Sequence, residues 1–126
     1  KKNLFISVGN ILEEVIDASK QLFKNYKIKS AVLDLVKVKP LSSNKLKNFI
    51  QSFEKIFIVE EHYITGGAGS ALVEWLEETK KKKNKIIKIG IKNEFIHGAG
   101  NQKNAREKVG ISSKQIIKKF LTVIKK

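Results

Sequence analysis

The sequence predicts an α/β fold, in which a mostly parallel sheet is covered by helices on both faces. Short apolar runs alternate four times along the 126 residues with stretches whose apolar residues recur at helical spacing. The run Ile56–Val59 is unbroken, which is typical of a strand buried on both faces of a parallel sheet. Such alternation implies right-handed crossovers and a single domain at this length.

The first strand is expected at residues 4–8, just before Gly9 and Asn10. A helix to about Asn25 follows, and Asn10 is its expected N-cap, with Glu13 at the third position of a capping box. One face of this helix is apolar or small: Leu12, Val15, Ile16, Ser19, Leu22 and Phe23. This is the pattern of a strand followed by its crossover helix.

The second strand is expected within residues 28–36, and Pro40 prevents its continuation as an interior strand. Ser42 and Ser43 are candidate caps for the next helix. The apolar face of that helix is expected to hold Leu46, Phe49, Ile50 and Phe53.

The third strand, Ile56–Val59, ends in three polar residues, Glu60, Glu61 and His62. A glycine-rich turn at residues 66–69 then leads into a helix over residues 70–76. Since neighbouring residues at a strand end point in opposite directions, the two glutamates are not expected to address one substrate together.

The fourth strand is expected at residues 86–91. A polar, glycine-dotted segment follows, with a short helix around residues 103–108. Ser112 and Gln115 form a capping box that is expected to open the last helix. The inner side of that helix carries Ile116, Ile117, Phe120, Leu121 and Ile124.

Four segments, in this order, carry a resemblance to a known family. They are residues 6–10 (ISVGN), residues 32–41 (VLDLVKVKPL), residues 56–70 (IFIVEEHYITGGAGS) and residues 89–98 (IGIKNEFIHG). The chain resembles the third, C-terminal domain of the transketolase family of thiamine-diphosphate enzymes. The resemblance implies a three-layer α/β/α sandwich on a five-stranded sheet ordered 1-3-2-4-5. The first, antiparallel strand is expected to be missing here, which leaves four strands ordered 2-1-3-4.

In that order the first and third strands are neighbours whose crossovers leave in opposite directions, so a crevice is expected beyond their C-terminal ends. The residues expected at this edge are Gly9, Asn10, Glu60, Glu61, His62, Gly66 and Gly67. In the family this loop lies towards the subunit interface. We therefore expect an interface or an active-site wall, and no catalytic, cofactor-binding or metal-binding residue in this domain.

The resemblance implies a role in a cytoplasmic, homodimeric transferase that moves a two-carbon ketol unit between sugar phosphates. Thiamine diphosphate and Mg²⁺ belong to the remaining domains of that parent enzyme, and this domain alone is expected to be inactive. Because methionine is absent even at position 1, residues 1–126 are expected to be a fragment of a longer chain. The same domain of a 1-deoxyxylulose-5-phosphate synthase, or of a 2-oxo acid dehydrogenase E1 β subunit, is the alternative.

Composition leaves one alternative from another class, a stand-alone basic module that binds nucleic acid. The formal net charge is +14, but only Arg106 among the 26 basic residues is an arginine, the residue that base and phosphate recognition favours. We therefore expect no nucleic-acid partner. Cysteine is absent, which excludes thiol chemistry, and no run is long enough for a membrane span.

Overall fold

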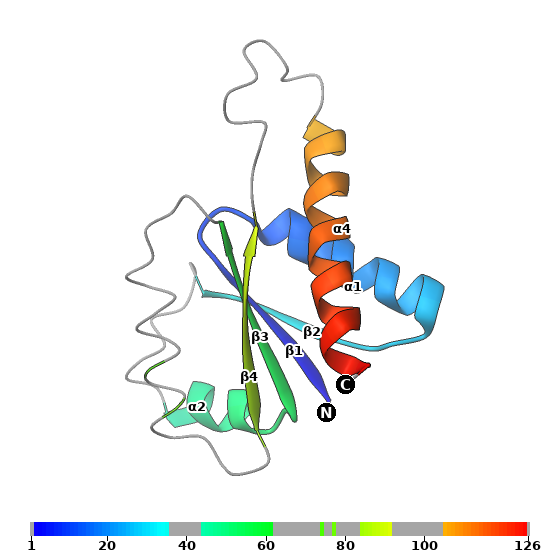
Figure 1. Ribbon diagram of the computed structural model, residues 1–126. Coiled ribbons are helices and arrows are strands. Elements are labelled where there is room, and N and C mark those ends of the chain that lie inside the picture. The colour runs from blue at the N-terminus through cyan, green and yellow to red at the C-terminus, as the bar shows by residue number, and fades with distance from the viewer. Residues whose placement is uncertain are drawn as a thin grey trace.

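The computed structural model describes residues 2–35, 44–61, 74, 77, 84–91 and 105–125. Strands and helices alternate in this part, as the sequence predicts (Figure 1). In chain order, the elements are β1 (Asn3–Val8), α1 (Leu12–Tyr26), β2 (Ala31–Asp34), α2 (Asn44–Gln51), β3 (Lys55–Glu61), β4 (Lys85–Ile91) and α4 (Ala105–Ile124).

The strands form one four-stranded sheet in the order β2-β1-β3-β4, and every neighbouring pair is parallel. The predicted order 2-1-3-4 is therefore confirmed. The two central strands are aligned so that Asn3 lies opposite Lys55 and Val8 opposite Glu60. Since β1 is buried along its whole length, the first strand of the sequence forms the middle of the core.

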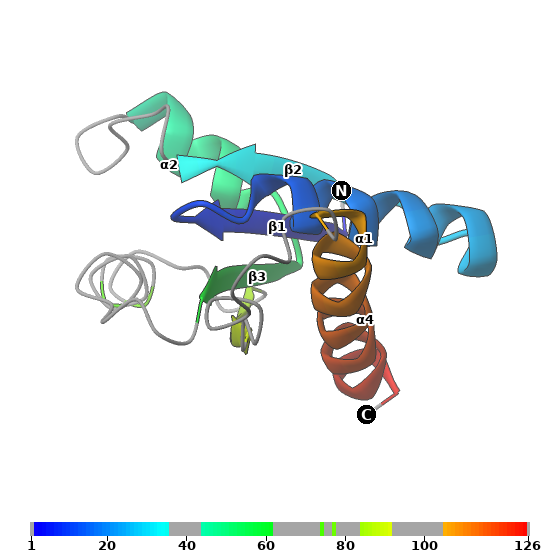
Figure 2. The same cartoon turned by 90° about the horizontal axis from the view of Figure 1, so that it is seen from above.

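One face of the sheet packs against α1 and α4, which cross it in Figure 2. At its centre the rings of Phe5, Phe57 and Phe120 lie in mutual contact, with centroids 4.8 to 5.6 Å apart. Aromatic pairs at such distances add to the burial of apolar area. The other buried members of this cluster are Ile11, Val15, Ala18, Leu22, Val59, Ile89, Ile91 and Ile116.

The opposite face of the sheet packs against α2, so that two helical layers enclose the strands. Its buried cluster consists of Leu4, Ile6, Val8, Leu46, Ile50, Phe53, Ile56 and Ile58. The predicted inner face of α2 is right for Leu46 and Ile50 but not for Phe49, whose ring is 37% exposed. Phe53 is buried just beyond the end of the helix, and Phe49 packs edge-on against it at 5.1 Å.

The start of α1 differs from the prediction. Asn10 is exposed, and the N-cap is Ile11, which makes no side-chain capping hydrogen bond. Gly9 has φ of 88°, a conformation that glycine adopts readily. The turn at Gly9 places Ile11 in the core, 1% exposed, and its carbonyl accepts the first helical bond from Val15 at 3.1 Å. Burial of Ile11 therefore decides where the helix begins.

The predicted short helix and the capping box at Ser112 are both wrong, because α4 runs without interruption from Ala105 to Ile124. Ser112 and Ser113 are buried inside it. Ser113 Oγ lies 2.7 Å from the carbonyl oxygen of Val109 and 2.5 Å from Asp17 Oδ2 on α1, so its one proton is shared between an acceptor in its own helix and one in the neighbouring helix. These contacts of Ser113 with α1 stabilise a helix that continues through Ser112 and Ser113 instead of beginning there.

Several expectations lie outside the described residues. The expected helix at 70–76 lies within residues 62–83, of which the structure describes only Glu74 and Glu77, both in helical conformation. The glycine turn at 66–69 and most of the polar segment after Ile91 are not described. Among the described residues, no helix has both the length and the apolar character that crossing a membrane requires.

Candidate functional site

The candidate site lies at the C-terminal edge of the sheet, where β1 and β3 end side by side. Val8 and Glu60 are partners in the register, and Gly9 and Asn10 follow β1 directly. From β1 the chain passes through α1 to β2, whereas β3 is followed by β4 on the other side. The chain therefore leaves the two central strands toward opposite sides of the sheet, and this is the position where open α/β sheets bind their ligands.

The structure brings four of the predicted site residues to this edge. Gly9 is half-buried, Asn10 is exposed, and Glu60 is 5% exposed. Glu61 ends β3, and its backbone lies opposite Ile91 in β4. The predicted residues His62, Gly66 and Gly67 lie outside the described part of the chain.

Glu60 forms an ion pair with a residue that the sequence analysis did not single out. Its Oε1 lies 2.7 Å from Nζ of Lys88 on the neighbouring strand β4. Lys88 is two residues before Gly90, the register partner of Glu60, so the two side chains are diagonal neighbours on one face. The Glu60 side chain is 7% exposed and that of Lys88 is 43% exposed. The carboxylate of this ion pair is therefore buried, whereas the ammonium of Lys88 reaches water.

Among the described residues, two side-chain oxygens near this edge are buried without a hydrogen-bond partner. They are Oε2 of Glu60 and Oγ of Ser7, which is fully buried. A buried polar atom without a partner costs about 1–3 kcal/mol, so native structures contain few of them. Glu60 lies on the same face of β3 as Ile56 and Ile58, which is the face covered by α2. Ser7 lies on the same face of β1 as Phe5, which is the opposite face of the sheet. The two oxygens thus mark both sides of the same edge.

This arrangement can accept hydrogen bonds from a partner that covers it. A carboxylate has about four acceptor positions, and Lys88 occupies one oxygen of Glu60. Among the described residues, no group of three or more histidine, cysteine, aspartate or glutamate side chains is placed to hold a metal ion. Neither described cavity is lined by Gly9, Asn10 or Glu60.

Signals for the two missed residues were present in the sequence. Lys88 interrupts the run of isoleucines at 86–91, and Ser7 interrupts the first apolar run. In a strand buried on both faces, any polar residue must find a partner or carry an unpaired group. Ser7 lies in the buried strand β1, whereas Lys88 lies on the partly exposed edge strand β4, where its ammonium reaches water.

Comparison with known protein families gives a match over most of the chain. The family described as "Transketolase, C-terminal domain" matches residues 1–116. The chain belongs to this family. The resemblance seen in the four sequence segments is thereby confirmed, together with the α/β fold that it implied.

The curated relatives include several proteins named 1-deoxy-D-xylulose-5-phosphate synthase. The one from Syntrophus aciditrophicus is 35% identical over 111 residues, which is 88% of this chain and 17% of that protein. The one from Halothermothrix orenii is 34% identical over 99 residues, which is 78% of this chain and 15% of that protein. The chain thus spans less than a fifth of the length of these relatives.

A solved structure entitled "Split gene transketolase, inactive beta4 tetramer" has the same fold. It superposes with a TM-score of 0.62 over 93% of this chain and 37% of its own, at 22% sequence identity. At that identity the likeness concerns the fold alone.

Proposed function

We propose that this chain serves as the C-terminal domain of a thiamine-diphosphate-dependent enzyme of the 1-deoxyxylulose-5-phosphate synthase type. The observation that carries the proposal is the 35% identity with the S. aciditrophicus synthase, over 88% of the chain. The 2-oxo acid dehydrogenase alternative and the nucleic-acid module have no such support among these relatives. In this proposal the preceding domains come from the same longer chain or from a separate subunit.

The name of the relatives' product distinguishes this reaction from ketol transfer. A 1-deoxy ketose ends in a methyl group, so its first two carbons come from a methyl-bearing donor rather than from a hydroxymethyl ketol. A five-carbon product then requires a three-carbon phosphorylated aldehyde as acceptor. Transfer of a ketol unit between sugar phosphates, the activity first expected from the sequence, is the second candidate. The two-carbon units that the two reactions transfer differ by this one hydroxyl group.

In this proposal the domain contributes to the subunit interface and to the wall of the active site, and the catalytic residues lie in other domains. Glu60 is held by β3 with one oxygen on Lys88 and the other without a partner. A donor from a neighbouring domain or from a second subunit would satisfy that oxygen, which supports an interface at the C-terminal edge of the sheet. We propose that Gly9, Asn10, Glu60, Glu61, His62, Gly66 and Gly67 form this interface in a homodimeric parent.

We propose that the cofactor and Mg²⁺ are bound by the other domains of a cytoplasmic parent enzyme. When bound, thiamine diphosphate supplies the ylid carbon that carries the two-carbon unit. Mg²⁺ takes oxygen ligands, mostly carboxylates and phosphates.

The test combines this chain with the domains that it lacks. A parent protein, or a mixture of this chain with the two preceding domains, is assayed with thiamine diphosphate and Mg²⁺ for formation of 1-deoxyxylulose 5-phosphate. The expected result is product from the complete assembly and none from residues 1–126 alone. Ketol transfer between sugar phosphates without the deoxy product would reject the synthase in favour of the second candidate.

A variant tests the interface separately. Glu60→Gln in the complete assembly is expected to weaken dimerisation by about tenfold or more, since a hydrogen bond to a charged group is worth about 1.5 kcal/mol or more. Glu13→Gln, an exposed acid in the first turn of α1, is the matched control and is expected to leave dimerisation unchanged. Equal dimerisation constants for both variants, from sedimentation equilibrium, would remove Glu60 from the interface.

A further inference from the structure

A cavity of about 500 Å³ lies at the edge of the sheet opposite the candidate site. It is formed where β1 and β3 begin and where α1 and α4 end. Its lining consists of Lys2, Asn3, Lys27, Ile28, Lys29, Lys55, Phe120 and Ile124, a set named here the basic pocket. The volume falls within the range of about 300–1,000 Å³ that is usual for small-molecule sites.

The backbone around the basic pocket is held by hydrogen bonds. The amide of Lys55 donates to the carbonyl of Lys2 at 2.8 Å, which joins the starts of β3 and β1. Asn3 Nδ2 donates to the carbonyl of Lys29 at 3.3 Å. Lys27 caps α1 in the left-handed conformation, and its amide bonds back to the last turn of the helix. The four lysines therefore start from fixed positions around one hollow.

The positive charge of the basic pocket is only partly explained by the helices. The C-terminal ends of α1 and α4 attract cations, but each end carries about half a negative charge, so together they balance about one of the four lysines. Within the described part of the chain, the ion pair Lys88–Glu60 involves none of them, and Glu54, next to Lys55 in sequence, does not line the pocket. The ammonium of Lys27 lies 5.9 Å from the centre of the Phe23 ring, a weak cation–π contact at an exposed position that a phosphate replaces when Lys27 turns to it. Several positive charges are left for a ligand.

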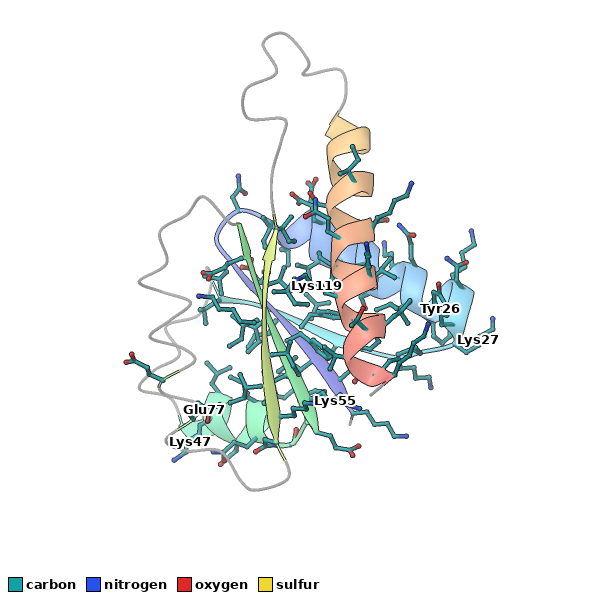
Figure 3. All side chains as sticks on the ribbon, viewed as in Figure 1. Tyr26, Lys27, Lys47, Lys55, Glu77 and Lys119 are labelled. Atoms are coloured by element: carbon teal, nitrogen blue, oxygen red, sulfur yellow. The ribbon has the colours of Figure 1, made fainter. Side chains whose placement is uncertain are left out.

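The floor of the basic pocket is apolar. Phe120 is fully buried beneath it, and Ile28 and Ile124 are partly buried against the same core cluster. Figure 3 shows Lys27 at the end of α1 and Lys55 at the start of β3, with α4 nearby. A ligand that suits both parts has an anionic group for the lysine rim and an apolar body for the floor.

We propose that the basic pocket binds a small organic phosphate. Its phosphate oxygens accept hydrogen bonds from the ammonium groups of Lys27, Lys29 and Lys55, and its apolar part covers Ile28 and Ile124. Lysine is a suitable point charge for phosphate, and added salt weakens such binding because it screens the exposed charges. The site lies away from the C-terminal edge, so it does not depend on the function proposed above.

The test uses phenyl phosphate, which joins a phosphate to an aromatic ring, together with inorganic phosphate as its anionic half. Each is titrated into the ¹⁵N-labelled 126-residue chain at low salt, and amide shifts are followed by NMR. We expect saturable shifts at residues 27–29, 55 and 124, with phenyl phosphate binding more tightly than inorganic phosphate. Lys27→Gln and Lys55→Gln are each expected to weaken phenyl phosphate about two- to fivefold.

The control is Lys45→Gln, which removes the same charge from an exposed position on α2, on the other face of the sheet. It is expected to leave the affinity unchanged. An equal loss from Lys45→Gln, shifts spread over lysines throughout the chain, or no saturable shift would each overturn the proposal. Lys27 is exposed and Lys55 half-buried, and circular dichroism verifies that each variant is folded.

Discussion

Lys88→Met is expected to destabilise the domain more than Glu60→Gln, although both substitutions break the same ion pair. Without Lys88, the buried carboxylate of Glu60 has no partner at either oxygen among the described residues. Leaving one member of a buried pair alone costs about 3–5 kcal/mol. Because the Lys88 side chain is 43% exposed, water can replace part of the lost contact, and we expect about 1–3 kcal/mol. Without the charge of Glu60, in contrast, Lys88 simply turns to water, and we expect a loss below about 1 kcal/mol.

Urea unfolding followed by far-UV circular dichroism measures both changes through the midpoint and slope of the transition. The double variant is expected to recover about 1–2 kcal/mol relative to the sum of the two single variants, because it removes the stranded charge. Lys118→Met, at an exposed position of α4, is the matched control and should stay within about 0.5 kcal/mol of the parent. A Lys88→Met variant no less stable than Glu60→Gln would refute the assignment of Glu60 as the buried, dependent partner.

Three further substitutions test the packing of the fold by the same unfolding measurement. Asn84→Ala removes the hydrogen bonds that the Asn84 amide donates to the carbonyls of Gln51 and Phe53, at 3.0 and 2.6 Å, which hold the end of α2 to the start of β4. We expect the free energy of unfolding to fall by about 2 kcal/mol. No loss would mean that water replaces both bonds. Ser113→Ala removes a buried hydroxyl 2.5 Å from Asp17 Oδ2, and about 1 kcal/mol is expected, with a gain contradicting the role of this bond between α1 and α4. Gly110→Ala is expected to stabilise by about 0.5–1 kcal/mol, since nothing lies within 4 Å of the added carbon; destabilisation would show strain in α4 at that point.

The sequence was sufficient to predict the elements whose signal is periodic and strong. The burial of β1 and β3, and of Val15 and Leu22 on α1, follows directly from unbroken or helically spaced apolar residues. The prediction is wrong for Phe23, which is 49% exposed near the end of α1, and Glu14 and Ala18 are buried instead. It was insufficient where a local signal competed with packing. Asn10 is a good capping residue, yet the helix begins after Ile11 because the core takes that side chain. Ser112 resembles the start of a helix, yet it lies inside α4.

The candidate site was predictable in position but not in its interactions. Strand ends can be located from the change of apolar to polar residues, which is why Gly9, Asn10 and Glu60 lie at the expected edge. The partner of Glu60 depends on the register between β3 and β4, which places Lys88 on the diagonal. Register across a crossover is a tertiary property, and the spacing of residues within either strand does not reveal it.

The distribution of charge is more informative than its sum. Although the chain has a net charge of +14, carboxylates are concentrated near the C-terminal edge of the sheet, at Glu13, Glu14, Asp34 and Glu60. The lysines of the basic pocket lie at the opposite edge, where strands begin and helices end. A parallel sheet places all strand ends on one side, so residues at equivalent positions in successive units add to one local field. Among the described residues, these four carboxylates thus lie near one edge of the sheet and the four lysines of the basic pocket lie at the other, a separation that the net charge alone does not indicate.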